Sequence, residues 1–156
     1  MATEQFIQIV EENISCWQQL LVQRGIRGVV TEGENLLRAA SMGLCVPQLW
    51  GLTAVYILQA YPIAESLGSG GQWAGVLETA VGTSPFTDSP LTIQLRNRLG
   101  RVHRLNQQPE KALNIHQQTL QQATPTTPAW AIAETHLNLA EDYHAQNDTA
   151  RAEYHA

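Results

Sequence analysis

Apolar residues recur three and four positions apart along most of the chain, and the alternation typical of a β-strand is almost absent. This spacing places apolar side chains on one face of an α-helix. Gly, Pro, Ser and Thr interrupt the pattern at intervals, as they do between helices. The pattern therefore predicts eight helices, near residues 4–24, 31–43, 47–66, 72–83, 90–106, 109–123, 128–146 and 149–156.

Several predicted helices begin with a capping signal. Thr31 and Glu34 have the spacing of a capping box, in which each side chain bonds the other residue's free backbone N–H. Ser89-Pro90 and Thr127-Pro128 each place a hydroxyl one residue before a proline at the first helical position. Short links between amphipathic helices favour antiparallel hairpins.

Four windows repeat a pattern of large and small residues. The third window reads Arg96-x2-Leu99-Gly100-x2-His103, followed by Ala112, His116 and Pro125. The fourth reads His136-x2-Leu139-Ala140-x2-Tyr143, followed by Ala152. The first reads Trp17-x2-Leu20-Leu21-x2-Arg24, followed by Gly33, Leu37, Ala40 and Pro47, and the second, a poorer match, starts at Trp50.

These windows resemble the tetratricopeptide repeat family, whose signature runs W-x2-L-G-x2-Y, then Ala, an aromatic residue and Pro. The resemblance implies an all-α fold, a right-handed solenoid of antiparallel helix pairs with about 3.5 to 4 repeats. The expected repeats form one domain over residues 1–156 and lie near 4–46, 47–84, 90–124 and 128–156, the last incomplete. The windows start 33, 46 and 40 residues apart, whereas the family period is about 34 residues.

The small residues of the pattern have a physical role, because two helices cross closely where side chains are small. We expect Gly33, Gly100, Ala112, Ala140 and Ala152 at such crossings. Larger residues fill the space beside them: Trp17, Leu20, Leu99, His103, His116, Leu139 and Tyr143. A bulky residue at Gly100 or Ala112 is expected to cost about 1–3 kcal/mol through overpacking.

The composition limits the classes of partner and the cellular compartments that are expected for this chain. Apolar residues make up 44% of the chain, enough for a core, and the formal charge is −5 with only nine Lys and Arg. Nucleic acid is therefore not an expected partner, since phosphate binding needs a dense positive face. Cys16 and Cys45 lack metal-ligand spacing and are expected to be buried free thiols in a reducing, cytoplasmic compartment.

The N-terminus does not read as a signal peptide, because Glu11 and Glu12 interrupt its apolar residues. No charged residue lies between Arg38 and Glu65. A membrane helix needs about 20 predominantly apolar residues in a row, and prolines and glutamines break this stretch. We expect a buried helix there and no membrane insertion.

No residue pattern indicates catalysis. His103 and His116 take positions that the repeat fills with aromatic residues, so we expect packed imidazoles. Glu141 and His144 could hold a metal on one helix face, but no third ligand has suitable spacing. Glu141-Asp142, like the other acidic pairs, is interpreted as solvated helix surface. We therefore predict no catalytic residue, no metal and no cofactor.

One face carries polar residues at helical spacing: Asn97, Arg101 and Arg104. In the tetratricopeptide family the first helices of the pairs line a groove, and some members hold a peptide carboxylate there with Asn, Lys and Arg. The resemblance thus implies a protein or peptide partner, and the candidate binding residues are Asn97, Arg101, Arg104, Glu141 and His144. The alternative is an internal salt bridge, in which Arg101 pairs with Glu141.

The last predicted helix, 149–156, stops after two turns without a polar cap, although terminal repeats normally need one. Either the chain is part of a longer protein, or a second copy covers this end. The sequence thus predicts a non-catalytic protein-interaction module. The alternative is a helical sensor or regulatory segment of a larger signalling or transcription-regulating protein.

Overall fold

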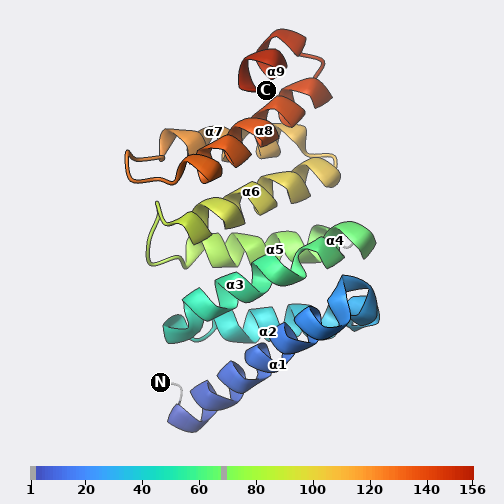
Figure 1. The fold of residues 1–156 in the computed structure, drawn as a ribbon, viewed down its shortest axis with the longest axis vertical. Helices are drawn as coiled ribbons and strands as arrows, with labels where there is room; N and C mark the ends of the chain where they lie inside the picture. Colours follow the sequence, from blue (N-terminus) through green and yellow to red (C-terminus); the bar gives the residue numbers. More distant parts are fainter. Residues whose placement is uncertain (1–2, 68–69) are drawn as a thin grey trace. The chain divides into compact units, whose positions relative to one another are not determined.

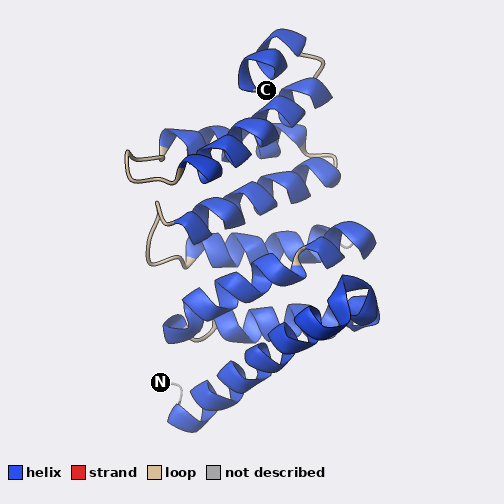
Figure 2. Ribbon diagram, in the orientation of Figure 1, coloured by secondary structure: helices blue, strands red, loops and turns tan. Residues whose placement is uncertain are grey.

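The computed structural model describes residues 3–67 and 70–156, and these contain only helices and the loops that connect them (Figure 2). The predicted all-α class is confirmed for this part of the chain. The chain divides into two compact units, Met1–Ser84 and Pro85–Ala156, called here the N-terminal and C-terminal units. The division falls between the second and third expected repeats.

In the N-terminal unit α1 packs against α2 and α3, and α5 packs against α2 (Figure 1). The elements of this unit are α1 (Glu4–Val29), η1 (Val30–Glu32), α2 (Gly33–Leu44), η2 (Pro47–Leu49), α3 (Trp50–Ala60), α4 (Pro62–Leu67) and α5 (Gly70–Gly82). Gly25 breaks the regular geometry of α1 with φ 64° and ψ 175°. This is the left-handed region that glycine tolerates, one residue beyond the predicted end of the first helix.

In the C-terminal unit each helix packs against the next one along the chain, and α6 also packs against α8 (Figure 1). The elements are α6 (Pro90–Leu105), α7 (Pro109–Gln121), α8 (Ala129–Ala145) and α9 (Thr149–His155). Gln107 and Asn147, which stand in the α6–α7 and α8–α9 turns, both have φ 60°. The two helical hairpins are therefore closed by equivalent turns.

The capping predictions have mixed outcomes. Ser89 caps α6, and its Oγ accepts a hydrogen bond of 3.2 Å from the Thr92 N–H. The capping box at Thr31 is wrong, because Thr31 lies inside η1 and the N-cap of α2 has no side-chain bond. Thr127 does not cap α8 either, since its Oγ1 accepts from the Thr124 N–H at 2.9 Å within the preceding loop.

Close helix crossings occur at Gly100 in the C-terminal unit and at Gly43 in the N-terminal unit. A Cβ built on Gly100 would lie 2.8 Å from Cδ2 of His116 and nearer still to the Nε2 and Cε1 atoms of that ring. In the N-terminal unit the tight site is Gly43, whose added Cβ would lie 2.6 Å from Ile14 Cδ1 and 2.8 Å from Thr53 Cγ2. Gly33, where a crossing is also expected, is the first residue of α2 and is partly exposed.

The other packing residues of the pattern differ in burial between the units. In the C-terminal unit Leu99, His103, Ala112, His116, Leu139 and Tyr143 are buried, and Ala140 and Ala152 are half-buried. In the N-terminal unit Trp17 and Leu20 are both partly exposed. The first window of the pattern therefore describes the core less well than the last two.

Cys16 and Cys45 are both free thiols, but both are exposed, so their predicted burial is wrong. Among the described residues no single helix is long and apolar enough to cross a membrane. One pair bent by 115°, Glu4–Leu44 with Pro47–Ser66, meets the criteria of length and composition only when the two parts are taken together.

Candidate partner-binding groove

The predicted arginine face is largely engaged within the C-terminal unit. Arg104 donates from Nη1 to Asp142 Oδ1 at 2.5 Å and to the Asn138 carbonyl at 3.3 Å, and from Nη2 to Glu141. Of the two interpretations of this face, an internal ion pair is present, and in it Arg104 is bonded to Glu141. Arg101 is half-buried.

The Asn97 side chain is not available to a partner, because it is buried and both its amide oxygen and its amide nitrogen are hydrogen-bonded within the unit. Its Oδ1 accepts from Thr135 Oγ1 at 3.2 Å, and its Nδ2 donates to Glu134 at 3.4 Å. Glu134 also forms a salt bridge of 2.7 Å with Arg98. Binding a peptide carboxylate at Asn97 would require these contacts to break. Of the candidate binding residues only Glu141 and His144 are exposed.

The carboxylate that organises this unit is Asp142. It is fully buried, and its second oxygen lies 2.5 Å from Nδ1 of His116, whose Nε2 faces the Asn97 carbonyl at 3.2 Å. Arg104 and His116 therefore hold Asp142 from α6 and α7. We call Arg104, His116, Asp142, Asn97 and Thr135 the Asp142 network.

The interpretation of Asp142 as solvated surface is wrong. Its position relative to the other residues of the helix could have predicted its burial. One helix face, with the spacing i, i+3, i+4 and i+7, contains Thr135, Asn138, Leu139 and Asp142. All four are buried. A charged residue in such a register needs partners, which here come from the two preceding helices.

Three other histidines contact neighbouring side chains, whereas His144 is exposed. His103 is buried with Nδ1 2.8 Å from Gln108 Oε1. His136 and His155 face each other with their Nδ1 atoms 2.8 Å apart, and the His155 ring stacks on Tyr143. Burial, and then the charge of His136, lower the pKa of His155 below its ordinary value. In the described ranges no three His, Cys, Asp or Glu side chains come together as a metal site.

An open groove lies in the N-terminal unit between α2 and α5. Three adjoining hollows of about 310, 390 and 370 Å³ share Gln72 as a lining residue. We call this surface the α2–α5 groove, lined from the α2 side by Glu34, Leu37, Ser41, Leu44 and Cys45, and from α5 by Gln72, Gly75, Val76 and Thr79. The sequence reasoning missed it, because neither helix carries a recognisable ligand motif.

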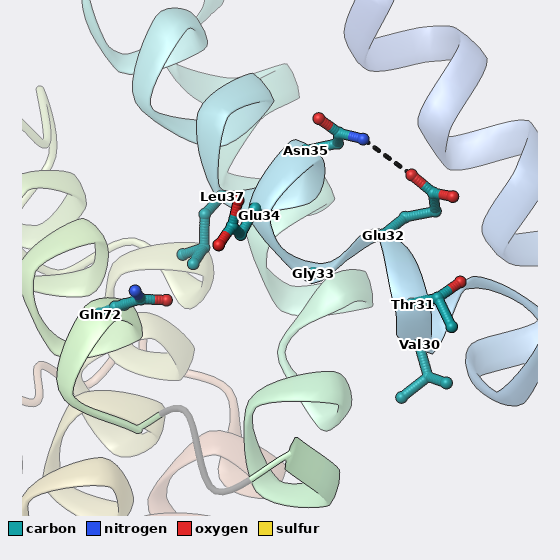
Figure 3. A pocket seen from close by; sticks show the side chains of 8 residues that line it. All are labelled: Val30, Thr31, Glu32, Gly33, Glu34, Asn35, Leu37 and Gln72. Carbon is teal, nitrogen blue, oxygen red and sulfur yellow. Dashed lines mark hydrogen bonds between the residues drawn. The ribbon is translucent and has the colours of Figure 1, made fainter.

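At one end of the groove Glu34 and Leu37 point from α2 toward Gln72 of α5 (Figure 3). Glu32 lies on the other side of the α2 start, where its carboxylate accepts a 2.7 Å hydrogen bond from Asn35 Nδ2 (Figure 3). Both glutamates line the hollow at this end, but Glu32 is bonded to Asn35, whereas Glu34 is exposed and points toward Gln72.

The middle of the groove presents mainly apolar surface. The Ser41 hydroxyl donates to the Leu37 carbonyl at 2.9 Å, and the Thr79 hydroxyl donates to the Gly75 carbonyl at 2.8 Å. Their donors are therefore already bonded to their own helices. Gly75 leaves the floor open, since a Cβ built there would meet no atom within 4 Å.

The arrangement of these side chains favours binding over chemistry. Among the described residues that line the α2–α5 groove there are two carboxylates, those of Glu32 and Glu34, one exposed thiol and no histidine. A nucleophile needs a base within hydrogen-bond reach, and the lining residues do not supply one.

Comparison with known proteins finds a matching family for only one part of the chain. Residues 91–156 match a family model described as tetratricopeptide repeat. No curated protein and no solved structure matched the chain. The α2–α5 groove lies outside the matched residues, whereas the Asp142 network lies within them. The resemblance to the tetratricopeptide repeat family is thereby confirmed for residues 91–156.

Proposed function

We propose that this protein is a non-catalytic interaction module that holds a segment of a protein partner in the α2–α5 groove. Tetratricopeptide repeats generally mediate protein–protein interactions and are typically non-catalytic. The groove supplies what such a role requires, which is a concave surface that is mainly apolar along its middle and polar at the Glu34 end.

The contrast between two surfaces carries the proposal. On the arginine face Arg104 and Asn97 are engaged by Glu141, Asp142, Thr135 and Glu134. In the α2–α5 groove the hydroxyls are bonded to their own helices and Gly75 faces open space. A partner therefore enters the groove without breaking an internal bond, whereas the arginine face would first lose several.

Site-specific photo-crosslinking tests the proposal. A photoreactive residue replaces Gln72, which lines all three hollows, and in a matched protein it replaces the exposed Gln19 on α1. In cells that express the chain naturally, the variant at Gln72 is expected to crosslink a protein that the variant at Gln19 does not. Gly75→Leu added to the Gln72 variant should abolish that crosslink by filling the groove.

Gly51→Leu is the control for Gly75→Leu. A Cβ at Gly51 also meets nothing within 4 Å, but Gly51 lies on α3 and does not line the groove. Both variants must keep the wild-type unfolding midpoint for the comparison to hold. Equal crosslinking from Gln72 and Gln19, or a crosslink that persists in Gly75→Leu, would reject the groove as the binding surface.

A further inference from the structure

We infer that the occupant of the α2–α5 groove is an amphipathic α-helix with an apolar stripe and a Lys or Arg at the end that meets Glu34. The inference rests on the proposed function and adds the kind of segment that the partner presents. It follows from three features of the groove, which are its backbone, the spacing of its lining residues and its charge.

Between the end turns of its two walls the groove offers no backbone groups to an extended segment. Residues 33–44 and 70–82, which form the walls, are α-helical, so beyond their terminal turns their N–H and C=O groups are bonded along their own helices. A strand lying between them would leave its own N–H and C=O groups without partners on a mainly apolar surface, and each such group is costly to bury unpaired. A helix satisfies its backbone internally and avoids this cost.

The lining residues form two parallel ridges. On α2 they follow the spacing Glu34, Leu37, Ser41 and Leu44, and on α5 the spacing Gln72, Val76 and Thr79. Glu34 lines the same hollow as Gln72, and Cys45 the same hollow as Thr79, so the two helices run in the same direction. Ridges of side chains at i, i+3, i+4 and i+7 leave a furrow that accepts the matching ridge of a third helix.

The length of the groove sets the length of the helix. From Glu34 to Cys45 the α2 wall contains 12 residues, which correspond to about 17 Å at the helical rise. A partner helix of about 12 residues, or three turns, covers that distance. Leu, Val or Met at i, i+3 or i+4, and i+7 of such a helix would contact Leu37, Leu44 and Val76.

The negative charge around the groove favours a partner helix with a basic residue at one end. Glu34 faces the groove, and the unit around it has seven glutamates against three arginines, a formal charge of −4. Arg38 follows Glu34 by four residues on α2 but does not line the groove. A Lys or Arg above Glu34 would form an exposed ion pair, and such pairs contribute about 0.2–1 kcal/mol, which selects the orientation of the helix more than its affinity.

The inference is tested by in vitro selection from a random peptide library. Peptides are selected for binding to the wild-type chain, and counter-selection against the Gly75→Leu variant removes those that bind outside the groove. The Gly51→Leu variant is a second target that should still bind the selected peptides. We expect enriched sequences with apolar residues at helical spacing and Lys or Arg near one end, helical by circular dichroism when bound. Glu34→Lys should weaken them about 2- to 5-fold, the range for an exposed pair, and Arg38→Gln should not weaken them.

The two exposed cysteines report the site directly. An enriched peptide is expected to slow alkylation of Cys45, which lines the groove, and to leave Cys16 on α1 unaffected. Enrichment of alternating or acidic sequences, or no enrichment over Gly75→Leu, would overturn the helix inference. If the Gln72 crosslink to a cellular protein persists in that case, the proposed function stands and only the kind of segment is wrong.

Discussion

The two units of this chain stack similar helices but hold them together by different chemistry. The largest fully buried side chains of the N-terminal unit are mainly apolar: Trp73, Tyr56, Ile14, Leu36, Ile57, Ile63 and Leu77. The C-terminal unit buries a set of polar side chains: Thr92, Asn97, His103, His116, Thr119, Thr127, Thr135, Asn138 and Asp142. Apolar packing is non-directional, whereas hydrogen bonds and ion pairs require defined geometry.

This difference bears on where a partner can bind. In the C-terminal unit the groups that resemble a ligand-binding set, Asn97 and Arg104, fix α6 against α8. In the N-terminal unit the core needs few such groups, so the outer faces of α2 and α5 are left to form a groove. Polar residues at helical spacing therefore indicate a binding face only when no buried partner of opposite charge lies on the neighbouring helix.

The largest expected effect comes from Asp142→Ala. The substitution leaves Arg104 and His116 without their shared carboxylate, and breaking a buried ion pair typically costs about 3–5 kcal/mol. Amides of residues 90–155 should lose protection in hydrogen exchange under mild urea, while those of α1–α3 keep theirs. Glu141→Gln is the control, since Glu141 is 57% exposed and should cost no more than about 1 kcal/mol. Equal effects of the two variants would contradict a structural role for the network.

The next-largest changes in the free energy of unfolding are expected from glycine substitutions in the two units. Gly100→Ala places a methyl group against His116, whose ring is bonded on both nitrogens, and should cost about 1–3 kcal/mol by overpacking. Gly43→Ala should cost a similar amount, because its methyl group would meet the buried, β-branched Thr53 as well as Ile14. Gly75→Ala should instead stabilise by about 0.5–1 kcal/mol, since it removes a helix-interior glycine. Urea unfolding midpoints measure all three, and a neutral Gly100→Ala would argue against the α6–α7 crossing.

A smaller effect is expected from Tyr56→Phe in the N-terminal unit. The Tyr56 hydroxyl donates to the Leu36 carbonyl at 3.0 Å within the apolar core, and burial raises the pKa of this phenol. Loss of one such hydrogen bond costs about 0.5–1.5 kcal/mol, measurable by urea unfolding. Tyr154→Phe is the matched control, because Tyr154 is 82% exposed and should not change stability. A cost for Tyr56→Phe above that for Asp142→Ala would reverse the proposed contrast between the units.

Much of the fold could be predicted from the sequence, because helix existence depends on local spacing. The ranges expected for α6 and α7 differ from the observed ones by no more than two residues at either end. Prolines at the first helical position and the Ser89 cap mark those starts. The capping signals at Thr31 and Thr127 failed, since each hydroxyl belongs to an adjoining turn whose course depends on tertiary contacts.

The binding surface could not be predicted in the same way. The α2–α5 groove forms where two helices that are 26 or more residues apart in sequence leave a space, and residue spacing within one helix carries no information on that gap. Asp142 was misread because a carboxylate next to Glu141 looks like surface unless its register with Leu139 is considered. In both cases the missing information was the identity of the neighbouring helix.

The smallest expected effect is a pH response of α9, the helix with no buried residue. The hydrogen bond between His136 and His155 needs one bare Nδ1, and His155 also stacks on Tyr143, whose ring lies 5.6 Å from the Arg151 guanidinium. Because the pKa of His155 is lowered in the folded chain, its neutral form stabilises docking. This stabilisation is present above the ordinary pKa of about 6.5 and is lost as the pH falls below it, because the undocked helix binds the proton first.

Hydrogen exchange at about pH 7.5 and pH 5.5, on either side of the ordinary histidine pKa, measures this response after correction for intrinsic rates. Protection of residues 149–155 should decrease at the lower pH, while α6 amides change little. His155→Gln keeps a polar side chain but cannot titrate, so its α9 should show no such pH dependence. A similar decrease in that variant would mean that another group controls the docking of α9. The apolar core of the N-terminal unit has no equivalent titrating pair in its described residues, so the response should be confined to the C-terminal unit.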